Sequence, residues 1–473
     1  MADSYLYRTQ GAPTGAGKKC TASAWVKSCR WSLAAGGTGG IFEVRNSATT
    51  STWDIYVDGN NIVMGVLDSS AWVGSLVGTP KLYDNSAWYH VVAIWDSTES
   101  TDTNRMQIWI NGVKETVFSS STYPSEDHIN TALASSSGYQ QQWGAYGYGG
   151  TSKWDGYLAQ CVFVDGLALP ATTFGSFDAT TGEWKPKSDG EVRSAVTFGD
   201  QGCLINFSNA SNLGYDYQTS DRSGTTNDFT VSGDGMQSQD NPSNNFPTIS
   251  PNYMPFDDPI FYPDIGNLYC QSQTSASTYF GGAATMGLSK GKWYWETKGY
   301  TGWNGGAIGV FGDPQKSADN DRTCGYNPHD WAYRSDGQVE NNNTTQDTGM
   351  GTYSSGEVIG TYLDLDNNKI YWAKDGTIIN SGTGWTITAA ASTTHGFYFP
   401  GQGDIAGSGG SYFALNYGNG WFKDAALTGT TYNDAQGQGI FKYSPNDGGA
   451  SSFDSSAKDF LAICTKNLKT YGG

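Results

Sequence analysis

Residues 88–117 read WYHVVAIWDSTESTDTNRMQIWINGVKETV, a succession of strand, polar loop, strand, tight turn and strand. From 106 to 111, apolar Met and Ile side chains alternate with Gln, Trp and Asn. This period of two is typical of a strand with one buried face. The Asn111-Gly112 pair that follows supplies the positive backbone angles of a two-residue hairpin turn. HVVAIW (90–95) is apolar on both faces, so we expect it to be a central strand.

The same succession recurs at residues 360–379, GTYLDLDNNKIYWAKDGTII, where an Asp-Gly pair again joins two strands. Two copies of one β pattern, far apart in the chain, indicate two all-β domains. The chain has 473 residues, which is room for two or three domains, and is rich in Gly (63), Tyr (29) and Trp (17). Such aromatic and turn residues favour strands and loops over helices.

We predict an all-β fold class with two jelly-roll-like β-sandwich domains, at 1–187 and 256–473, joined by a packed irregular connector at 188–255. In the first domain, strand-like segments follow one another at the spacing of a sandwich, with Gly, Ser, Asp and Asn between them. The connector contains the strand-like CLINF (203–207), and its apolar residues are regularly spaced. We therefore expect the connector to pack against one of the domains.

The formal net charge is −18 at pH 7, and Lys and Arg form no run. Nucleic acid and anionic membranes both require clustered cations, so we expect neither as a partner. The N-terminal MADSYLYRTQG lacks the basic and apolar regions of a secretory signal. No apolar stretch approaches the ~20 residues of a membrane span, so we expect no membrane insertion.

Seven cysteines are scattered along the chain with no C-x-x-C pair: Cys20, Cys29, Cys161, Cys203, Cys270, Cys324 and Cys464. An odd number without close spacing argues against a disulfide framework and against a zinc site. We interpret them as reduced thiols that are mostly packed in the interior.

The order of five segments in the first domain resembles the laminin-G/concanavalin-A-like jelly roll: AWVKS, WDIYVDG, WYHVVAIWD, MQIWINGVK and WDGYLAQCVFVDGLAL. The segment TTFGSFDATTGEWKPK (172–187) is similar to one that follows such domains in phage and prophage structural proteins. The connector also looks like the joint found in those proteins. This resemblance implies a protein of a virion.

The second domain resembles the SPRY domain, the core of the B30.2 family, through four segments in order: KWYWE, AIGV, YLDLDNNKIYWAKDG and ALNYGNG. It departs from that pattern by long insertions rich in Gly, Asp and Asn at 313–331, 341–353 and 401–411.

Catalysis finds little support in the sequence. Jelly-roll glucanases use an E-x-D-x-x-E strand whose carboxylates must be a few ångströms apart, and that pattern is absent. Asp364 and Asp366 share one strand face, which we interpret as solvated. Glu296 and His90 are interpreted as paired structural residues. Neither G-x-S-x-G nor a P-loop occurs. We expect no enzyme activity and no cofactor other than a possible calcium ion.

Calcium is the metal that the acidic loops allow, because it prefers several carboxylate and carbonyl oxygens. One candidate set is Asp96, Glu99 and Asp102, and another is Asp313, Asp319 and Asp321. Neither set has the spacing of an EF-hand. The alternative is that both are ordinary solvated acidic loops.

Saccharide binding is the activity that the loops favour most. Aromatic faces pack against the apolar side of a sugar, and Asp, Asn and Gln side chains hydrogen-bond its hydroxyls in fixed directions. We predict ligand contacts from Trp143, Tyr146, Trp303, Asn304, Asp330, Trp331, Tyr333, Arg334 and Trp385. The alternative for each aromatic is core packing, because 14% of all residues are aromatic.

These patterns favour a non-enzymatic virion structural or adhesion protein of a phage, of the tail-fibre, spike or head-decoration type. Its loops would bind host surface polysaccharide, and its other partners would be virion proteins. A homo-oligomer, as a trimer, is expected because fibres and spikes are commonly trimers. We expect assembly in the host cytoplasm. The alternatives are a purely architectural capsid or tail subunit, a glycan depolymerase on the jelly roll, and a peptide-binding adaptor.

Overall fold

The computed structural model describes residues 4–29, 38–80, 82–218, 227–249, 261–272, 280–300, 305–312, 323–404, 411–446 and 459–472. The chain divides into two compact units, Met1–Gln237 (unit 1) and Ser238–Gly473 (unit 2). Both are built mainly of antiparallel strands, which confirms the predicted all-β, two-domain fold class. The predicted connector 188–255 is shared between the two units, because the division falls at residue 237.

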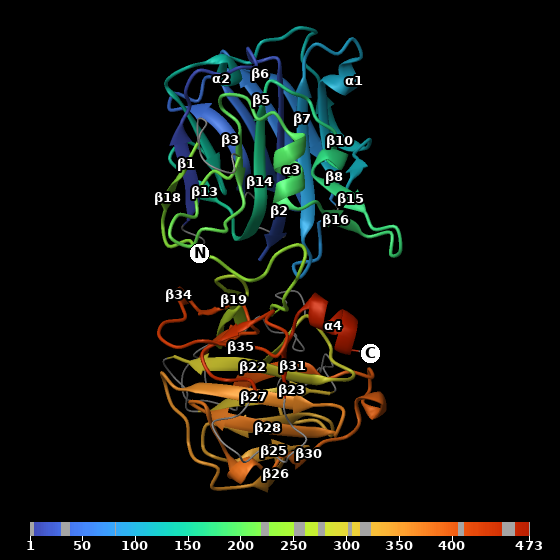
Figure 1. Cartoon of the computed structure of the whole chain (residues 1–473), viewed down its shortest axis with the longest axis vertical. Coiled ribbons are helices and arrows are strands. Elements are labelled where there is room, and N and C mark those ends of the chain that lie inside the picture. The colour runs from blue at the N-terminus through green and yellow to red at the C-terminus, as the bar shows by residue number, and fades with distance from the viewer. Residues whose placement is uncertain are drawn as a thin grey trace. The chain divides into compact units, whose positions relative to one another are not determined.

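Two large sheets form unit 1 (Figure 1). The eight-stranded sheet has the order β10 (Phe118–Thr122), β6 (Ala71–Gly78), β5 (Asn61–Asp68), β4 (Thr52–Asp58), β3 (Thr38–Asn46), β11 (Tyr139–Trp143), β1 (Tyr5–Thr9) and β18 (Thr230–Ser232). The six-stranded sheet has the order β17 (Cys203–Ile205), β14 (Gly156–Asp165), β2 (Lys19–Ser28), β7 (Tyr89–Asp96), β8 (Met106–Ile110) and β9 (Val113–Lys114).

The main core of unit 1 lies between these sheets. Alternate residues of each strand point into it, as the period of two requires: Phe42 and Val44 from β3, and Val91, Ala93 and Trp95 from β7. The intervening residues of the six-stranded sheet, such as Val92 and Ile94, belong to a second core on its other face. HVVAIW is therefore buried on both faces in an interior strand, as predicted.

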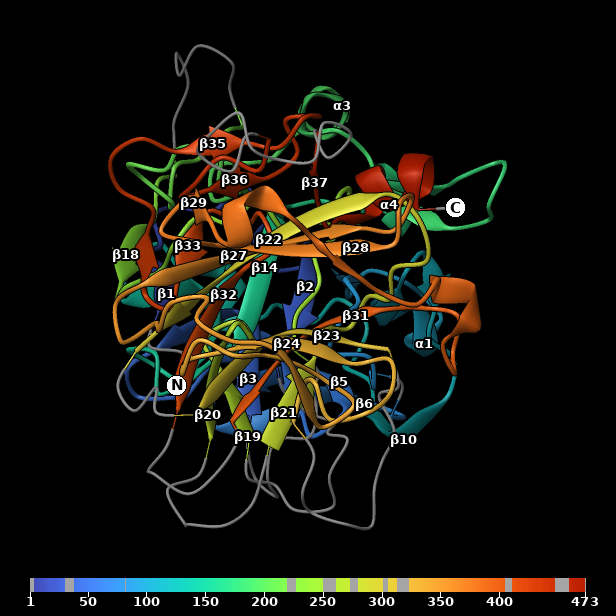
Figure 2. The same cartoon turned by 90° about the horizontal axis from the view of Figure 1, so that it is seen from below.

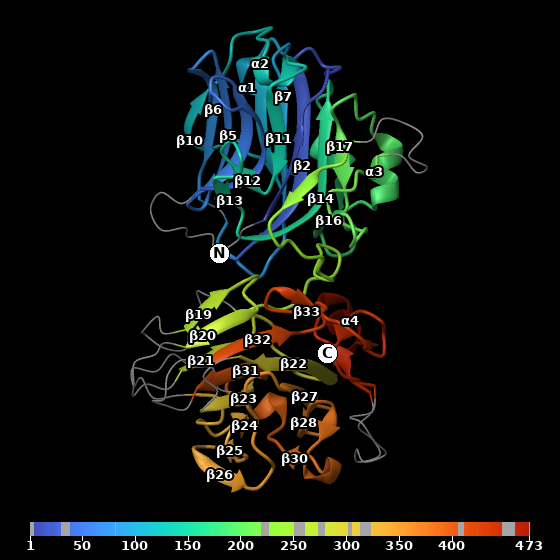
Figure 3. The same cartoon turned by 90° about the vertical axis from the view of Figure 1, so that its left-hand side faces the viewer.

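The second core is covered by the chain that follows β14. Its elements are η1 (Ala171–Thr173), β15 (Gly175–Phe177), β16 (Trp184–Pro186) and α3 (Asp189–Ala195). Val192 of α3 and Val196 pack against Trp25 and Leu204 in this core. Figure 3 shows α3 beside β17, on the outside of the sheet. Unit 1 also contains α1 (Asp102–Arg105), α2 (Thr131–Ala134), β12 (Ala145–Tyr146) and β13 (Ser152–Lys153).

Arg8 joins the later part of the unit to its first strand. Its guanidinium donates to Gln141 Oε1 at 2.9 Å, to Asn227 Oδ1 at 2.7 Å and to the Gln201 carbonyl at 2.8 Å. These bonds, with β17 and β18, hold the first part of the predicted connector against unit 1. A packed connector was the expectation for this segment.

Unit 2 also contains two layers (Figure 2), with β22, β27 and β28 in one and β23 and β24 in the other. The first sheet has the order β19 (Phe261–Asp264), β20 (Tyr269–Ser272), β32 (Tyr412–Asn416), β22 (Lys292–Gly299), β27 (Val358–Asp364), β28 (Lys369–Lys374) and β29 (Thr377–Ile378), with β30 (Trp385–Thr386) on β28 and β37 (Leu461–Ala462) on β22. The second has the order β21 (Phe280–Ala283), β31 (Phe399–Asp404), β23 (Gly306–Phe311), β24 (Trp331–Arg334), β25 (Val339–Asn341) and β26 (Thr344–Asp347).

The remaining elements of unit 2 are short: η2 (Asn380–Gly382), η3 (Ala390–Ser392), β33 (Trp421–Phe422), β34 (Ala425–Ala426), β35 (Tyr432–Asn433), β36 (Ile440–Phe441) and α4 (Thr465–Tyr471). Between the two sheets, the rings of Tyr333 and Trp372 lie 6.1 Å apart. No helix among the described residues is long and apolar enough to cross a membrane.

The two sequence repeats occupy equivalent places in their units. Residues 88–117 form β7, β8 and β9, and residues 360–379 form β27, β28 and β29. Asn111 and Gly112 have φ of 48° and 77°, and Asp375 and Gly376 have φ of 46° and 78°. Both turns therefore have the left-handed backbone that the Asn-Gly and Asp-Gly pairs predict.

Glu296 of β22 fixes the C-terminal part of unit 2 onto the first sheet. The carboxylate is fully buried and accepts hydrogen bonds from the backbone N–H of Lys442 (3.0 Å) and Tyr443 (2.7 Å). Asn416 Nδ2 (2.9 Å) and the Tyr294 hydroxyl (3.1 Å) also donate to it. Burial nevertheless raises the pKa of Glu296 to about 7. This confirms the prediction of a paired structural residue.

The buried Glu296 makes the stability of unit 2 depend on pH. Its pKa rises from about 4.5 to about 7 on folding, so the folded chain binds the extra proton between these pH values. Wild-type stability therefore falls as the pH rises through this range. Relative to Glu296→Gln, which cannot titrate, we expect the free energy of unfolding of the wild type to fall by about 3 kcal/mol as the pH rises through this range. Urea unfolding of both full-length proteins from pH 4 to 8 measures this, and parallel pH profiles would contradict it.

Candidate functional site

The second sheet of unit 2 ends in two hairpins that carry exposed polar side chains. The first joins β24 to β25 through Ser335, Asp336, Gly337 and Gln338. Gly337 has φ of 84°, which only glycine adopts easily, and the Arg334 N–H donates to the Gln338 carbonyl at 2.9 Å. The second joins β25 to β26 through Asn342 and Asn343, with φ of 54° and 51°. Both turns use the residues that favour a left-handed backbone.

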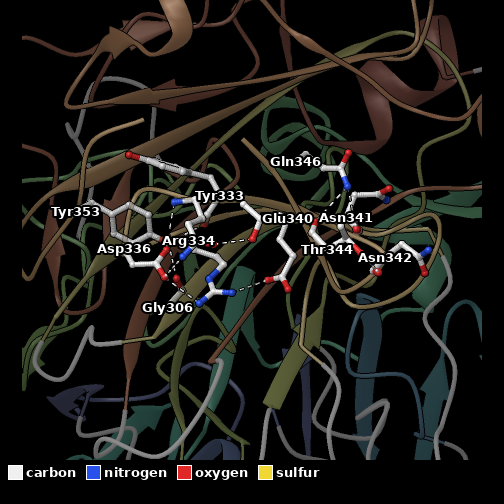
Figure 4. A network of polar contacts seen from close by, with 12 residues as sticks. Gly306, Tyr333, Arg334, Asp336, Glu340, Asn341, Asn342, Thr344, Gln346 and Tyr353 are labelled. Atoms are coloured by element: carbon white, nitrogen blue, oxygen red, sulfur yellow. Dashed lines mark hydrogen bonds and ion pairs between the residues drawn. The ribbon is translucent and has the colours of Figure 1, made fainter. Parts of the chain in front are cut away.

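Arg334 lies at the centre of a network of polar contacts on the first hairpin (Figure 4). Its Nη1 donates to Glu340 Oε2 at 3.1 Å, and its Nη2 donates to Asp336 Oδ2 at 2.9 Å. Its buried Nε has no hydrogen-bond partner among the described residues. Two carboxylates thus hold the guanidinium in one orientation, with 20% of its side chain exposed.

Amide and hydroxyl groups extend this network toward the edge of the sheet. Gln338 Nε2 donates to Asp336 Oδ2 at 3.0 Å, and the Thr345 hydroxyl donates to Gln338 Oε1 at 2.7 Å. Residues 342–346 are all exposed. We define the Arg334 surface as Arg334, Asp336, Gln338, Glu340, Thr345 and Gln346. The sequence predicted Arg334 as a ligand contact but not Asp336, Gln338 or Glu340. The polar residues on both sides of the Asp336-Gly337 turn indicate a hairpin with a polar surface.

Two tyrosines support the Arg334 surface from inside. The Tyr353 hydroxyl donates toward the Gly306 and Tyr333 carbonyls, at 2.7 Å and 2.9 Å. The Tyr333 hydroxyl donates to the Gly351 carbonyl at 2.5 Å. Burial raises the pKa of both phenols, so both remain donors at neutral pH. The hairpin therefore rests on a rigid base.

Three of the predicted ligand contacts belong to this base rather than to a surface. Tyr333 is fully buried, and Trp331 is 8% exposed in β24. Asp330 is buried, and its carboxylate accepts bonds from the Gly312 N–H (3.0 Å) and from Asn327 (2.8 Å to Nδ2). The expected exposure of Trp331 was wrong, because β24 is an interior strand of its sheet. Asp330 lies just before this strand, and Tyr333 points into the interior from it.

Trp143 is also not a loop residue. It ends β11, is 1% exposed and packs 4.2 Å from the ring of Phe42 in the main core of unit 1. The strand was missed because Gln141, a polar residue, also points to the interior, where it accepts a bond from Arg8. Because the polar Gln141 occupies a core position, apolar and polar residues do not alternate along β11.

The other predicted contacts have mixed outcomes. Tyr146 is half-buried, with its ring 4.6 Å from that of Tyr56. Trp385 is half-buried against Trp372, with ring centroids 5.3 Å apart. Both therefore lie outside the Arg334 surface as defined above. Trp303 and Asn304 lie outside the described residues.

The first proposed calcium set is not assembled into a metal site. Asp96 is buried, accepts bonds from the backbone and hydroxyl of Thr98 and pairs with Lys19 at 2.9 Å. Glu99 and Asp102 are exposed. Within the described part of the chain, no group of three or more His, Cys, Asp or Glu could hold a metal ion. Asp313, Asp319 and Asp321 lie outside the described residues.

His90 is held in the interior by its two ring nitrogens. Nδ1 accepts from Trp184 Nε1 at 3.0 Å, so the ring proton lies on Nε2, which meets Ser23 Oγ at 2.8 Å. The ring stacks on Trp25 at 4.8 Å, and burial lowers the pKa of His90 to about 3. In a catalytic triad a carboxylate accepts the Nδ1 proton of the histidine, whereas Nδ1 of His90 accepts a hydrogen bond from Trp184. The arrangement around His90 is therefore not that of a triad.

The acidic pair at the end of β27 also has a structural role. Asp364 is fully buried, and its carboxylate accepts from the Asn367 N–H at 3.0 Å and from Asn367 Nδ2 at 2.8 Å. Asp366 Oδ1 accepts from the Gly291 N–H at 3.0 Å. The expected solvated face was wrong for Asp364, because its side chain closes the turn to β28.

The seven cysteines are all buried and form no disulfide with one another, as expected from their spacing.

Comparison with known proteins supports the expected SPRY resemblance. Residues 292–400, which include the Arg334 surface, match the SPRY domain family. The SPRY domain of human HERC1 is 18% identical; the match covers 35% of this chain and 96% of that one, with a TM-score of 0.29. Domains LG4-5 of the mouse laminin alpha1 chain are 11% identical, over 93% and 90% of the two chains, with a TM-score of 0.28. No curated protein matches the chain.

The buried position of Trp143 can be tested directly. Trp143→Ala removes a buried indole from the main core, and we expect it to lower the free energy of unfolding by about 3–5 kcal/mol. Tyr148→Ala, in the next loop, is the matched control: Tyr148 is 45% exposed. Its effect should stay within about 0.5 kcal/mol. Urea unfolding measures both, and equal effects would contradict the core position of Trp143.

Proposed function

We propose that this chain is a non-enzymatic recognition protein and that the Arg334 surface of unit 2 binds glycans. The observation that carries the proposal is the arrangement of that surface. A guanidinium, two carboxylates, an amide and a hydroxyl lie together on two hairpins, within a segment that matches the SPRY family. Binding residues concentrate in such loops on rigid scaffolds.

The polar groups of this surface suit hydroxyl groups. A sugar hydroxyl both donates and accepts, so it needs acceptors and donors at fixed positions. Asp336 and Gln338 supply acceptor oxygens, and Arg334 and Gln338 supply donors. Because the ion pairs and the base below hold these side chains, little side-chain freedom is lost on binding. An anchored surface of this kind favours recognition of a fixed hydroxyl pattern.

The absence of enzyme activity is part of the proposal. The two residues that most resembled catalytic groups, His90 and Glu296, have their hydrogen-bonding atoms occupied by Trp184, Ser23 and four donors. Both are fully buried. These contacts support structural roles for both residues.

The virion location is the remaining part. It is supported by the sequence resemblance of residues 172–187 and of the connector to phage structural proteins. In a virion, several copies of the chain would convert weak glycan contacts into useful avidity. The outer strands β26 and β10 are exposed at the edges of their sheets, and contact with virion proteins or with further copies would cover them. A purely architectural subunit is the alternative.

Binding of the full-length protein to an array of bacterial surface glycans tests the recognition proposal. We expect binding to at least one glycan, and Arg334→Ala and Gln338→Ala should weaken it at least tenfold. Arg334→Ala leaves the buried Glu340 carboxylate without its guanidinium partner, so urea unfolding of this variant checks that it is folded under the binding conditions. Lys185→Ala, which removes the partner of Asp178 at 2.7 Å in unit 1, is the charge-matched control and should bind like the wild type.

Two results would contradict this proposal. Failure of the full-length protein to bind any glycan would favour the architectural alternative. Release of reducing ends from a bound polysaccharide would favour a depolymerase. Co-purification of the protein with phage particles tests the virion location separately.

A further inference from the structure

The outer face of the eight-stranded sheet in unit 1 carries a pair of buried carboxylates. Glu43 of β3 and Asp54 of β4 are direct neighbours across the two strands. Their neighbours Phe42, Val44 and Trp53 point into the main core, so both acids point away from it. Both are nevertheless at most 1% exposed. Two acids on an outer face are normally solvated, so something specific covers these.

One arginine and one amide contact the pair. Arg45 Nη1 lies 3.3 Å from Glu43 Oε2. Gln142 Nε2 donates both to Glu43 Oε1 and to the Gly147 carbonyl, the latter at 2.8 Å. Asp54 Oδ2 accepts from the Thr52 hydroxyl at 2.9 Å. Glu43, Arg45, Asp54 and Gln142 form what we call the outer-face cluster.

The outer-face cluster is not internally satisfied. Arg45 Nε, Asp54 Oδ1 and Gln142 Oε1 are buried and have no partner at full hydrogen-bond geometry among the described residues, although the Gly65 N–H lies close enough to the Asp54 carboxylate to lower its pKa. They comprise one donor and two acceptors. Buried polar atoms are almost always paired, and unpaired ones commonly await a water or a ligand. By contrast, each oxygen of the buried Glu296 carboxylate in unit 2 accepts two hydrogen bonds.

The charge of the outer-face cluster also favours a neutral ligand. Burial raises the pKa of Glu43 to about 8 and that of Asp54 to about 7, while Arg45 opposes both shifts. Two carboxyl groups therefore share one guanidinium and retain a proton near neutral pH. A protonated carboxyl group both donates and accepts, as a hydroxyl ligand requires. A metal ion is disfavoured by the guanidinium beside Glu43.

An exposed aromatic ring lies beside the cluster. Trp72 of β6 is 54% exposed. Gly74, two residues on, faces Met106 in the core, and the register shift between Val66 and Leu67 turns Trp72 to the outer face. A side chain at Gly65 would collide with Asp54 Oδ1 and would lie 2.9 Å from the Trp72 ring. The rim of the indole and the Asp54 carboxylate therefore share the space that Gly65 leaves.

Tyrosines border the cluster on its other side. The ring of Tyr146, in the small β12–β13 hairpin, lies 4.6 Å from that of Tyr56 and 5.5 Å from the Arg45 guanidinium carbon. The loop between these strands contains Gly147, Gly149 and Gly150, all with positive φ. Aromatic rings thus flank the polar atoms on both sides, which is the combination that recognises the apolar and hydroxyl faces of a sugar.

We propose that the outer-face cluster, with Trp72 as its stacking platform, is a second binding site of this protein, for a neutral saccharide. A pyranose ring stacks on the exposed indole, and its hydroxyls reach Asp54 Oδ1 and the other unpaired atoms. The half-exposed Trp72 ring moves to admit them. This inference goes beyond the Arg334 surface, because the site lies in unit 1 and shares no residue with it.

Isothermal titration of the full-length protein with neutral hexasaccharides of glucose, N-acetylglucosamine, mannose and galactose tests this site. We expect at least one to bind, and both Trp72→Ala and the isosteric Asp54→Asn to weaken its binding at least tenfold. Tyr83→Ala is the matched control, since Tyr83 is an exposed aromatic of unit 1 (60%) outside the cluster. It should bind like the wild type.

Hydrogen exchange locates the bound saccharide independently of any variant. With the saccharide that binds, amides of 52–78 should be protected, whereas those of 331–347 should not change. Binding that survives Trp72→Ala and falls in Arg334→Ala would overturn this site and support the Arg334 surface alone. Absence of binding by all four saccharides would also overturn it. Release of reducing ends that stops in Glu43→Gln would overturn it in favour of hydrolysis by the carboxylate pair.

Discussion

The central antiparallel ladder of each unit is buried on both faces, and the rest of the structure depends on this constraint. In unit 1, β2, β7 and β14 pack against the eight-stranded sheet on one side and against α3 and its neighbouring segments on the other. In unit 2, β22 and β27 lie between the second sheet and the chain around residues 441–444. A polar side chain in such a strand cannot reach water, so it must find its partners inside the protein.

This constraint explains why residues that resemble chemistry in the sequence are structural. His90 is paired on both ring nitrogens, Glu296 accepts four hydrogen bonds, and Asp364 closes the turn at the end of its strand. Each is surrounded by the groups that its burial demands. Recognition is consequently displaced to hairpins and outer faces, where a side chain can be held by neighbours and still reach solvent.

The two candidate surfaces differ in how completely their polar groups are paired. On the Arg334 surface, two ion pairs hold the guanidinium at the rim of a sheet, and Asp336, Thr345 and Gln346 are exposed. In the outer-face cluster, the charges are buried but a donor and two acceptors are left without partners at full hydrogen-bond geometry among the described residues. The first therefore offers a pre-oriented surface, and the second offers hydrogen-bonding capacity that the protein itself does not use. Ligand contact would satisfy the second at the cost of moving an aromatic ring.

By itself, the sequence determined the fold class, the two-fold repetition of the strand pattern and the turns at Asn111-Gly112 and Asp375-Gly376, because these depend on period and on local backbone preference. The tertiary structure alone decided which faces are solvated. Trp143, Trp331 and Asp364 are buried, and Glu43 lies opposite Asp54 on the neighbouring strand. A period of two tells which residues share a face, but it does not tell what lies against that face. That depends on other segments of the chain, such as Gln142 beside Glu43 and Trp72 beside Asp54.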